Sequence, residues 1–220
     1  MHVHTKYSYD SSITLKELIF YSKAQGLDGV AITDHDTTRG LKDFCKIRNL
    51  LIIPGAEITT DQGHVLAINI TASIRNGLSF VDTIDEIHCA GGVAIAAHPT
   101  ALLMGISEEK LRQGFDAMEV VNSSAVPFSF SVFRNRRIAT RLGLPQTGGS
   151  DAHYGPEVGM AYTRVDSEAD VDEVVKAIRR GAISAFGRSI PWSMRLKRIF
   201  SRRENKYGDL GFEGLQLIQA

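Results

Sequence analysis

The sequence has little cysteine and no excess of charge of either sign. Only two of its 220 residues are cysteines, Cys45 and Cys89, and they do not form a CxxC pair. We therefore expect neither a disulfide framework nor thiolate ligation of a metal, and a reducing, cytoplasmic location is the simplest interpretation. The 25 basic and 25 acidic residues give a formal net charge of zero. Proteins that mainly bind nucleic-acid backbone usually carry a basic excess, so a stable nucleic-acid complex is not expected.

Long apolar runs are missing as well. No run approaches the roughly 20 residues that a membrane-spanning helix needs, and the polar N-terminus does not have the form of a signal peptide. We therefore expect no membrane segment. The composition, 43% hydrophobic and 23% charged, is typical of a globular chain that is long enough to bury one substantial core.

Short β-rich runs alternate with helical patterns along the chain. Strands are predicted at residues 1–5, 29–35, 50–58, 64–70, 92–99, 117–122 and 144–153. Helices are predicted at residues 13–27, 78–92, 130–145 and 167–182, the second with Ser79 as its N-cap and Gly91 as its stop. This alternation is typical of parallel βαβ units, and seven units in this length favour an α/β barrel over a long open sheet.

The predicted strand ends carry imidazoles and carboxylates. His2 and His4 alternate with Val3 on the first strand, so both side chains project to the same side, which is a chelating geometry. Groups of the same kinds follow in the next loop and at later strands: Asp10, Asp34, His35, Asp36, Glu57, His64, His98, Asp151 and His153. Active sites of barrels and open α/β sheets lie at the carboxyl ends of strands. Six of the seven histidines are therefore expected at one rim, and only His88 falls within a predicted helix.

Such a cluster indicates bound cations. A single histidine on an apolar strand is more often a hydrogen-bonded core residue than a ligand. Six imidazoles and several carboxylates at one rim, however, would be costly to bury unless cations filled the cluster. Imidazole and carboxylate without thiolate suit Zn²⁺, Mn²⁺ or Fe²⁺ rather than Ca²⁺. The number of donors suits two or three ions with a bridging carboxylate.

In order and spacing, these motifs resemble those of the PHP family, whose name stands for polymerase and histidinol phosphatase. The motifs are HVH at residues 2–4, Asp10, ITDHD at 32–36, GAEIT at 55–59, His64, AAHP at 96–99 and GSDAH at 149–153. The resemblance extends from His2 to about Arg188. It implies a distorted (β/α)7 barrel of the TIM-like type, a trinuclear metal centre and phosphoesterase activity.

The resemblance also implies a ligand set, in which every family position has an acceptable residue here. One metal would be held by His2, His4, Glu57 and Asp151, a second by Glu57, His64 and His98, and a third by Asp10, His35 and His153. Manganese or zinc is the main expectation, with iron or magnesium as further candidates. Strand alternation points Asp34 away from His35, so we expect Asp34 to orient a ligand, and the role of Asp36 stays open.

The expected reaction is hydrolysis of a phosphate ester, most closely of a nucleotide or short oligonucleotide, by attack of a metal-bound hydroxide on phosphorus. Asp151, His153 and Glu57 are the candidate catalytic residues. The general acid stays open between a metal-bound water, His153 and Asp36. Arg39 and Arg134 are candidate phosphate contacts because a guanidinium can bind phosphate through two hydrogen bonds.

Two other functions and a domain boundary remain open from the sequence. A metal-dependent amidohydrolase also uses a His-x-His strand in a barrel. A non-catalytic RNA-binding barrel is the other alternative, for which the basic segment at residues 195–206 is the supporting feature. We place the metallophosphoesterase barrel at residues 1–190 and a basic C-terminal extension, a helix plus a flexible tail, at residues 191–220.

Overall fold

The computed structural model describes residues 1–44, 47, 49–100 and 106–201. The helices are α1 (Leu15–Ala24), α2 (Leu41–Phe44), α3 (Phe80–Cys89), α4 (Glu108–Leu111), α5 (Phe128–Leu142) and α6 (Val171–Arg179), with the 3-10 helix η1 (Gly155–Glu157). The strands are β1 (Gly29–Ala31), β2 (Leu51–Ile53), β3 (Gly55–Thr59), β4 (His64–Ile68), β5 (Val93–Ala96), β6 (Ala117–Asn122), β7 (Gln146–Gly149), β8 (Ala161–Val165) and β9 (Ile183–Gly187). Residues 192–201 are also helical.

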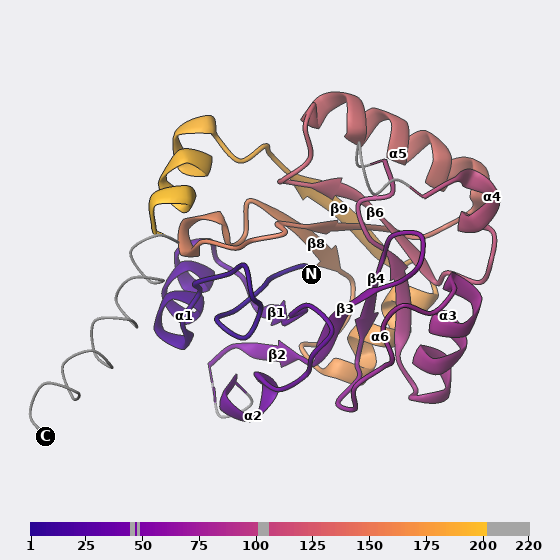
Figure 1. The fold of residues 1–220 in the computed structure, drawn as a ribbon, viewed down its shortest axis with the longest axis horizontal. Coiled ribbons are helices and arrows are strands. Elements are labelled where there is room, and N and C mark those ends of the chain that lie inside the picture. The colour runs from indigo at the N-terminus through magenta and orange to yellow at the C-terminus, as the bar shows by residue number, and fades with distance from the viewer. Residues whose placement is uncertain (45–46, 48, 101–105, 202–220) are drawn as a thin grey trace, which may run out of the picture.

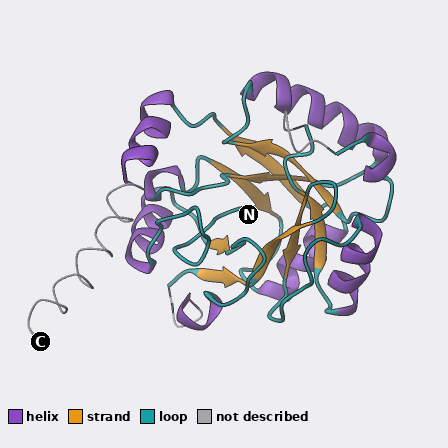
Figure 2. Ribbon diagram, in the orientation of Figure 1, coloured by secondary structure: helices purple, strands orange, loops and turns teal. Residues whose placement is uncertain are grey.

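The strands lie inside a layer of helices, and the N-terminus lies among the strands (Figures 1 and 2). The largest sheet has the strand order β3-β4-β5-β6-β7, and β1-β2 and β8-β9 form two further pairs. Residues 1–5 join these parts without forming a regular strand: the His4 amide donates to Ala152 O (2.9 Å) and the Thr33 amide donates to Val3 O (2.9 Å). The N-terminal His-x-His is thereby inserted between the ends of two distant segments.

The mixed α/β fold is confirmed, but the uniformly parallel arrangement is wrong. The β3-β4, β4-β5 and β8-β9 pairs are antiparallel, whereas β1-β2, β5-β6 and β6-β7 are parallel. The reason is connection length: residues 60–63 alone separate β3 from β4, and a parallel pair needs a crossover of about a dozen residues. Within the described ranges the regular strands form three separate sheets and no closed barrel. The seven-stranded barrel therefore stays a prediction.

Most predicted elements are present, with three differences. The predicted strand at residues 1–5 is wrong, because this segment forms only an isolated bridge between Val3 and Ala152. The predicted strand at residues 50–58 is divided into β2 and β3 at Pro54, which has no amide hydrogen for a ladder. The β8-β9 pair was not predicted as strands. The predicted cap of α3 is confirmed, because the Ser79 side chain accepts a hydrogen bond from the Asp82 amide, and Gly91 follows the helix with φ of 79°.

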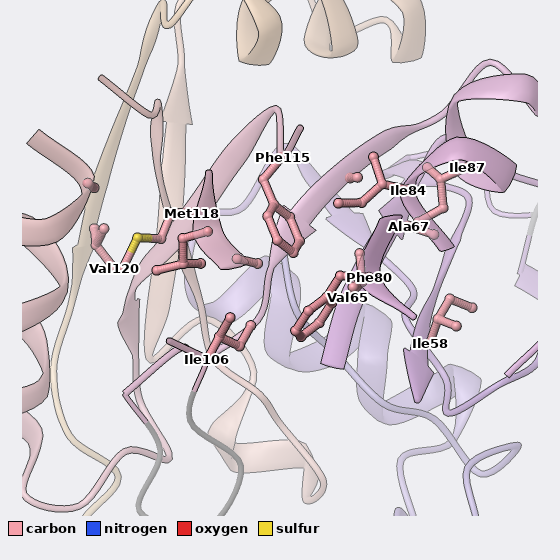
Figure 3. Close-up of a cluster of buried hydrophobic side chains, with 14 of the residues drawn as sticks. Ile58, Val65, Ala67, Phe80, Ile84, Ile87, Ile106, Phe115, Met118 and Val120 are labelled. Carbon is pink, nitrogen blue, oxygen red and sulfur yellow. The ribbon is translucent and has the colours of Figure 1, made fainter. Parts of the chain in front are cut away.

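A large apolar core holds the sheet and α3 together. Phe80, Ile84 and Ile87 on one face of α3 pack over Val65 and other side chains of the five-stranded sheet (Figure 3). Phe80 is 1% exposed and Ile87 is fully buried, and each burial of this size contributes about 1.5–3 kcal/mol. The core fixes β4 and β5, so the residues at their ends are held on a rigid support.

Three further expectations concern the cysteines, membrane-spanning segments and the domain boundary. Cys89 is a free, exposed thiol, while Cys45 lies outside the described residues. None of the helices in the described part of the chain has the length and apolar character needed to traverse a bilayer. The boundary at residue 190 stays a prediction, and the part of the predicted extension from residue 202 onward lies outside the described residues.

Candidate metal centre

The structure brings together the nine residues of the ligand set that the resemblance implies, with Glu57 of β3 at their centre. Its Oε1 atom lies 3.0 Å from both His64 Nδ1 and His98 Nε2. Its Oε2 atom faces the other side, within 3.2–3.3 Å of ring nitrogens of His2, His4 and His35. The two oxygens of one buried carboxylate thus serve two different groups of imidazoles. His64 reaches this edge from the beginning of β4 because β4 runs antiparallel to β3.

Three donor atoms, His2 Nε2, His4 Nε2 and Glu57 Oε2, lie close enough together to hold one metal ion, and Asp151 Oδ1 lies beside the two histidines. His2 Nε2 and His4 Nε2 lie 3.1 Å apart, 3.3 and 3.2 Å from Glu57 Oε2, and 3.5 and 3.4 Å from Asp151 Oδ1. A tetrahedral zinc site with bonds of about 2.0–2.1 Å has ligand-to-ligand separations of about 3.3 Å. The spacing of these donors therefore fits one divalent ion.

Hydrogen bonds to the outer nitrogens of the His2 and His4 rings also indicate a metal site. His2 Nδ1 donates to Glu119 Oε1 (3.1 Å). His4 Nδ1 donates to Ser8 Oγ (3.1 Å), and the Ser8 hydroxyl hydrogen goes to Asp34 Oδ1 (2.9 Å). In neutral rings both inward Nε2 atoms then carry lone pairs. Two lone pairs that face each other and two carboxylates need a cation between them, so the donor set fits a metal ion.

The third group lies where the N-terminal loop meets the loop after β7. Asp10 Oδ2 is 3.0 Å from His153 Nε2 and 3.5 Å from His35 Nε2. His153 Nδ1 donates to the backbone oxygen of Asp151 (2.9 Å), which leaves Nε2 as the lone-pair nitrogen of the neutral ring. His4, Asp10, His35 and His153 together offer ligand atoms within 4.8 Å of one another. This group can therefore hold a cation as well.

The carboxylates change the proton affinity of the buried imidazoles. Burial alone would lower the pKa of His4, but hydrogen bonds with Asp151 and Glu57 outweigh burial and raise the pKa to about 9. Burial would likewise raise the pKa of Glu57, yet the charge of His2 and its hydrogen bond hold that pKa well below its ordinary value. Positive charge is therefore stabilised between these groups, either as protons or as metal ions.

Backbone strain coincides with the centre. His98 has φ of 28° and Asp151 has φ of 51°, values that non-glycine residues rarely adopt. Both follow a strand, and both are held by contacts with the site: the His98 amide donates to Glu119 Oε2 (2.9 Å) and the Asp151 amide donates to His2 O (2.8 Å). Strain of this kind persists where the surroundings over-determine it, which is common at functional sites.

Glu119 of β6 contacts the candidate centre and was missed by the motif analysis. It is fully buried, and its two oxygens accept hydrogen bonds from His2 Nδ1, the His98 amide and Asn122 Nδ2. Asn122 Nδ2 also reaches Asp151 Oδ2 at 3.3 Å. Glu119 thereby orients ligands from three segments. The signal in the sequence was a single acidic residue inside the apolar run at 117–122, since a buried carboxylate needs partners.

We expect the Glu119→Gln variant to lose about 10–100-fold in metal affinity or in activity, the usual cost of removing a partner that orients a metal ligand. A glutamine can accept from His2, but its amide nitrogen would face the donors of His98 and Asn122. Metal titration of the purified variant measures the loss. Glu86→Gln, at a surface ion pair with Arg75, is the control. Equal affinity in wild type and Glu119→Gln would contradict the role.

The two flanking aspartates have different surroundings. Asp34 is buried and accepts from the Thr5 amide, the Thr5 hydroxyl and Ser8 Oγ, so it acts on His4 through Ser8. Asp36 has φ of 52°, and its Oδ1 accepts from the Thr59 amide (2.8 Å). Asp36 thus joins the loop after β1 to the end of β3.

The two candidate phosphate-binding arginines are exposed. Arg39 follows the loop of Asp36, and its Nε donates to Thr37 Oγ1 (3.3 Å). The structure does not bring Arg134 of α5 into hydrogen-bond contact with any of the described site residues. Their role in phosphate binding stays a prediction.

Two other arginines, on the helix at residues 192–201, support the rim of the site. Arg195 donates to the backbone oxygens of Ser123 and Ser124 (3.2 and 3.1 Å), and Ser124 Oγ donates to Asp151 O (3.3 Å). Arg198 pairs with Glu157 (3.4 Å), whose Oε2 also accepts from the His153 amide (2.9 Å). The C-terminal helix thereby stabilises the loops that carry Asp151 and His153.

Comparison with known proteins agrees with this geometry. The family model described as the PHP domain matches residues 1–125, more than half of the chain. The chain belongs to the PHP family. A second model, described as PHP-associated, matches residues 133–183. The resemblance predicted from the motifs is therefore confirmed. Two solved structures with this fold are described as a predicted and a putative metal-dependent phosphoesterase.

Three proteins illustrate what this PHP protein is similar to: one is a relative in sequence and two are solved structures. The uncharacterized protein MJ1587 of Methanocaldococcus jannaschii is 31% identical over 137 residues, 56% of this chain and 80% of that protein. A two-domain protein of Bacteroides vulgatus, described as containing a predicted PHP-like metal-dependent phosphoesterase, has a TM-score of 0.73 at 18% identity, covering 85% of this chain and 63% of that one. The lesion-specific endonuclease PfuEndoQ of Pyrococcus furiosus has a TM-score of 0.63 at 17% identity, covering 84% and 56%. This chain spans less than two thirds of both solved proteins, and at these identities the likeness establishes the fold.

Proposed function

We propose that this chain hydrolyses a phosphate ester of a nucleotide or a short oligonucleotide, with two or three divalent metal ions, manganese or zinc above all. The observation that carries the proposal is the position of Glu57, whose two oxygens each face a different group of imidazoles at 3.0–3.3 Å. A buried carboxylate in this position fits a bridge between metal ions, and multinuclear centres of this kind suit phosphoryl transfer.

The proposed ligand groups follow from these contacts. His2, His4, Glu57 and Asp151 would hold one ion, Glu57, His64 and His98 a second, and Asp10, His35 and His153 a third. Such ions, when bound, supply Lewis-acid activation of water and offset negative charge on the phosphoryl group.

The residues of the chain hold the donors in the form that binds a cation. Glu119 and Ser8 accept from the outer nitrogens of His2 and His4, so in the neutral rings the Nε2 atoms carry the lone pairs that would bind the ion. The backbone oxygen of Asp151 does the same for His153. We therefore assign His153 to ligand binding rather than to protonation of the leaving group.

One observation supports a substrate from the nucleotide class, and a second weighs against the RNA-binding alternative. The solved protein PfuEndoQ, which shares the fold, is described as a lesion-specific endonuclease. The RNA-binding barrel is less well supported, because the described arginines of the basic segment are used within the protein: Arg195 binds backbone oxygens and Arg198 binds Glu157.

The test combines metal content with hydrolysis. The protein is stripped with EDTA, reloaded with Mn²⁺ or Zn²⁺, and assayed against a nucleoside monophosphate, a nucleotide bisphosphate, a short oligonucleotide and glycerol phosphate. We expect more than one metal per chain and phosphate release from a nucleotide substrate. His98→Ala and Asp151→Ala should lose both. His88→Ala is the matched control, since His88 pairs with Asp116 at 2.8 Å, on α3 and away from the nine residues. Bound metal without release of phosphate from any substrate would overturn the proposal.

A further inference from the structure

Tyr9 is an exposed aromatic side chain at the edge of the candidate metal centre. It lies in the loop between His4 and Asp10, and its ring stacks on the ring of His35 with centroids 5.1 Å apart and planes 23° apart. Its exposed fraction is 87%, against 64% for Phe20 on α1. Among the described residues with large exposed apolar side chains, Tyr9 is the one whose ring contacts a candidate ligand.

The loop holds Tyr9 in this position from both sides. The Ser8 amide donates to Thr5 O (2.9 Å), and Ser8 Oγ donates to Asp34 and accepts from the His35 amide (3.1 Å). Asp10 on the other side lies 3.5 Å from His35 Nε2. Because Ser8 is buried and Asp10 contacts His35, the backbone on both sides of Tyr9 is held in place, which reduces the conformational entropy that is lost when a second ring binds.

The position of His35 connects Tyr9 to the substrate. Its Nδ1 is 3.2 Å from Glu57 Oε2 and its Nε2 is 3.5 Å from Asp10 Oδ2, so the ring that Tyr9 covers lies between two ligand groups. A phosphate bound at these groups would leave the organic part of its ester directed toward the rim, where Tyr9 is the nearest described aromatic surface in stacking contact with the site.

We propose that Tyr9 is a stacking platform for the nucleobase of the substrate and so determines the preference for nucleotides over base-free phosphate esters. This inference rests on the proposed function. Stacking on an aromatic side chain tolerates any base, because every base has a π-face. Tyr9 therefore selects for the presence of a base and not for its identity.

The kinetic test compares two substrates in three proteins. For Tyr9→Ala, we expect the ratio of kcat/KM for a nucleoside monophosphate to kcat/KM for glycerol phosphate to fall about tenfold, the order of one lost base–aromatic stack, mainly through KM. Tyr9→Phe keeps the ring and should restore the ratio. Phe20→Ala, which removes an exposed ring on α1, is the control. An unchanged ratio in Tyr9→Ala, with both substrates lowered equally, would show that Tyr9 only shields His35 and would overturn the inference.

A binding measurement separates this inference from the proposed function. A fluorescent purine nucleotide, whose emission is quenched by stacking, is titrated into wild type and Tyr9→Ala. Quenching in wild type and its loss in Tyr9→Ala supports the platform even if no phosphate is released. Equal quenching in both proteins, or none in wild type, overturns it. Absence of hydrolysis with any substrate, by contrast, contradicts the proposed function.

Discussion

The Glu57→Gln variant will lose at least about a thousandfold in kcat and will bind fewer than half of the metal ions that the wild type binds. Glu57 is 1% exposed, and its two oxygens contact five histidines. Glutamine has nearly the same size, so the core keeps its packing. It lacks the negative charge, however, and its amide nitrogen turns a donor toward nitrogens that should bind a cation. A loss of several kcal/mol of charge stabilisation corresponds to this change in rate.

Metal content by elemental analysis and single-turnover hydrolysis measure the two effects. Glu173→Gln is the control with the same chemical change, since Glu173 lies on α6 in an exposed pair with Lys176. We expect its metal content and rate to match the wild type. Full metal content in Glu57→Gln would show that Glu57 is not the shared ligand, and the grouping around it would have to be abandoned.

The Gly149→Ala variant should be destabilised by at least about 2 kcal/mol, which lowers Tm by about 4–8 °C in a chain of this size. A Cβ at this position would lie 2.4 Å from the Cβ of His2 and would also collide with Glu119 Oε1. The clash pushes apart a metal ligand and the carboxylate that orients it. Metal affinity should therefore fall together with stability.

Thermal unfolding with and without EDTA distinguishes these two consequences. In wild type we expect added metal to raise Tm, because it would bind only the folded state, and in Gly149→Ala this increment should shrink. Gly91→Ala serves as the comparison: Gly91 has φ of 79° and open space around its Cβ, so it tests backbone strain alone, at about 1 kcal/mol. An undiminished effect of EDTA in Gly149→Ala would mean that the contact between β7 and His2 does not support the centre.

The two ends of α3 could be predicted from the residues at those positions. The α3 helix begins after Ser79 and ends before Gly91 because a hydroxyl caps the first turn and glycine accepts a positive φ. The antiparallel pairing of β3 with β4 could not be predicted from the sequence, because a short apolar run does not show whether its strand pairs parallel or antiparallel. The split at Pro54 and the β8-β9 pair depended likewise on which strands became neighbours.

The sequence by itself determined the donor atoms of this centre. Metal ligation requires imidazole or carboxylate at particular places, and the residues from His2 to His153 provide them in motifs that can be read directly. The tertiary structure alone decided which partners orient those donors. Glu119 reaches His2 across 117 positions of sequence, and Gly149 is required only because β7 passes so close to both. Such contacts depend on how distant segments pack in three dimensions, and no local pattern of residues encodes that packing.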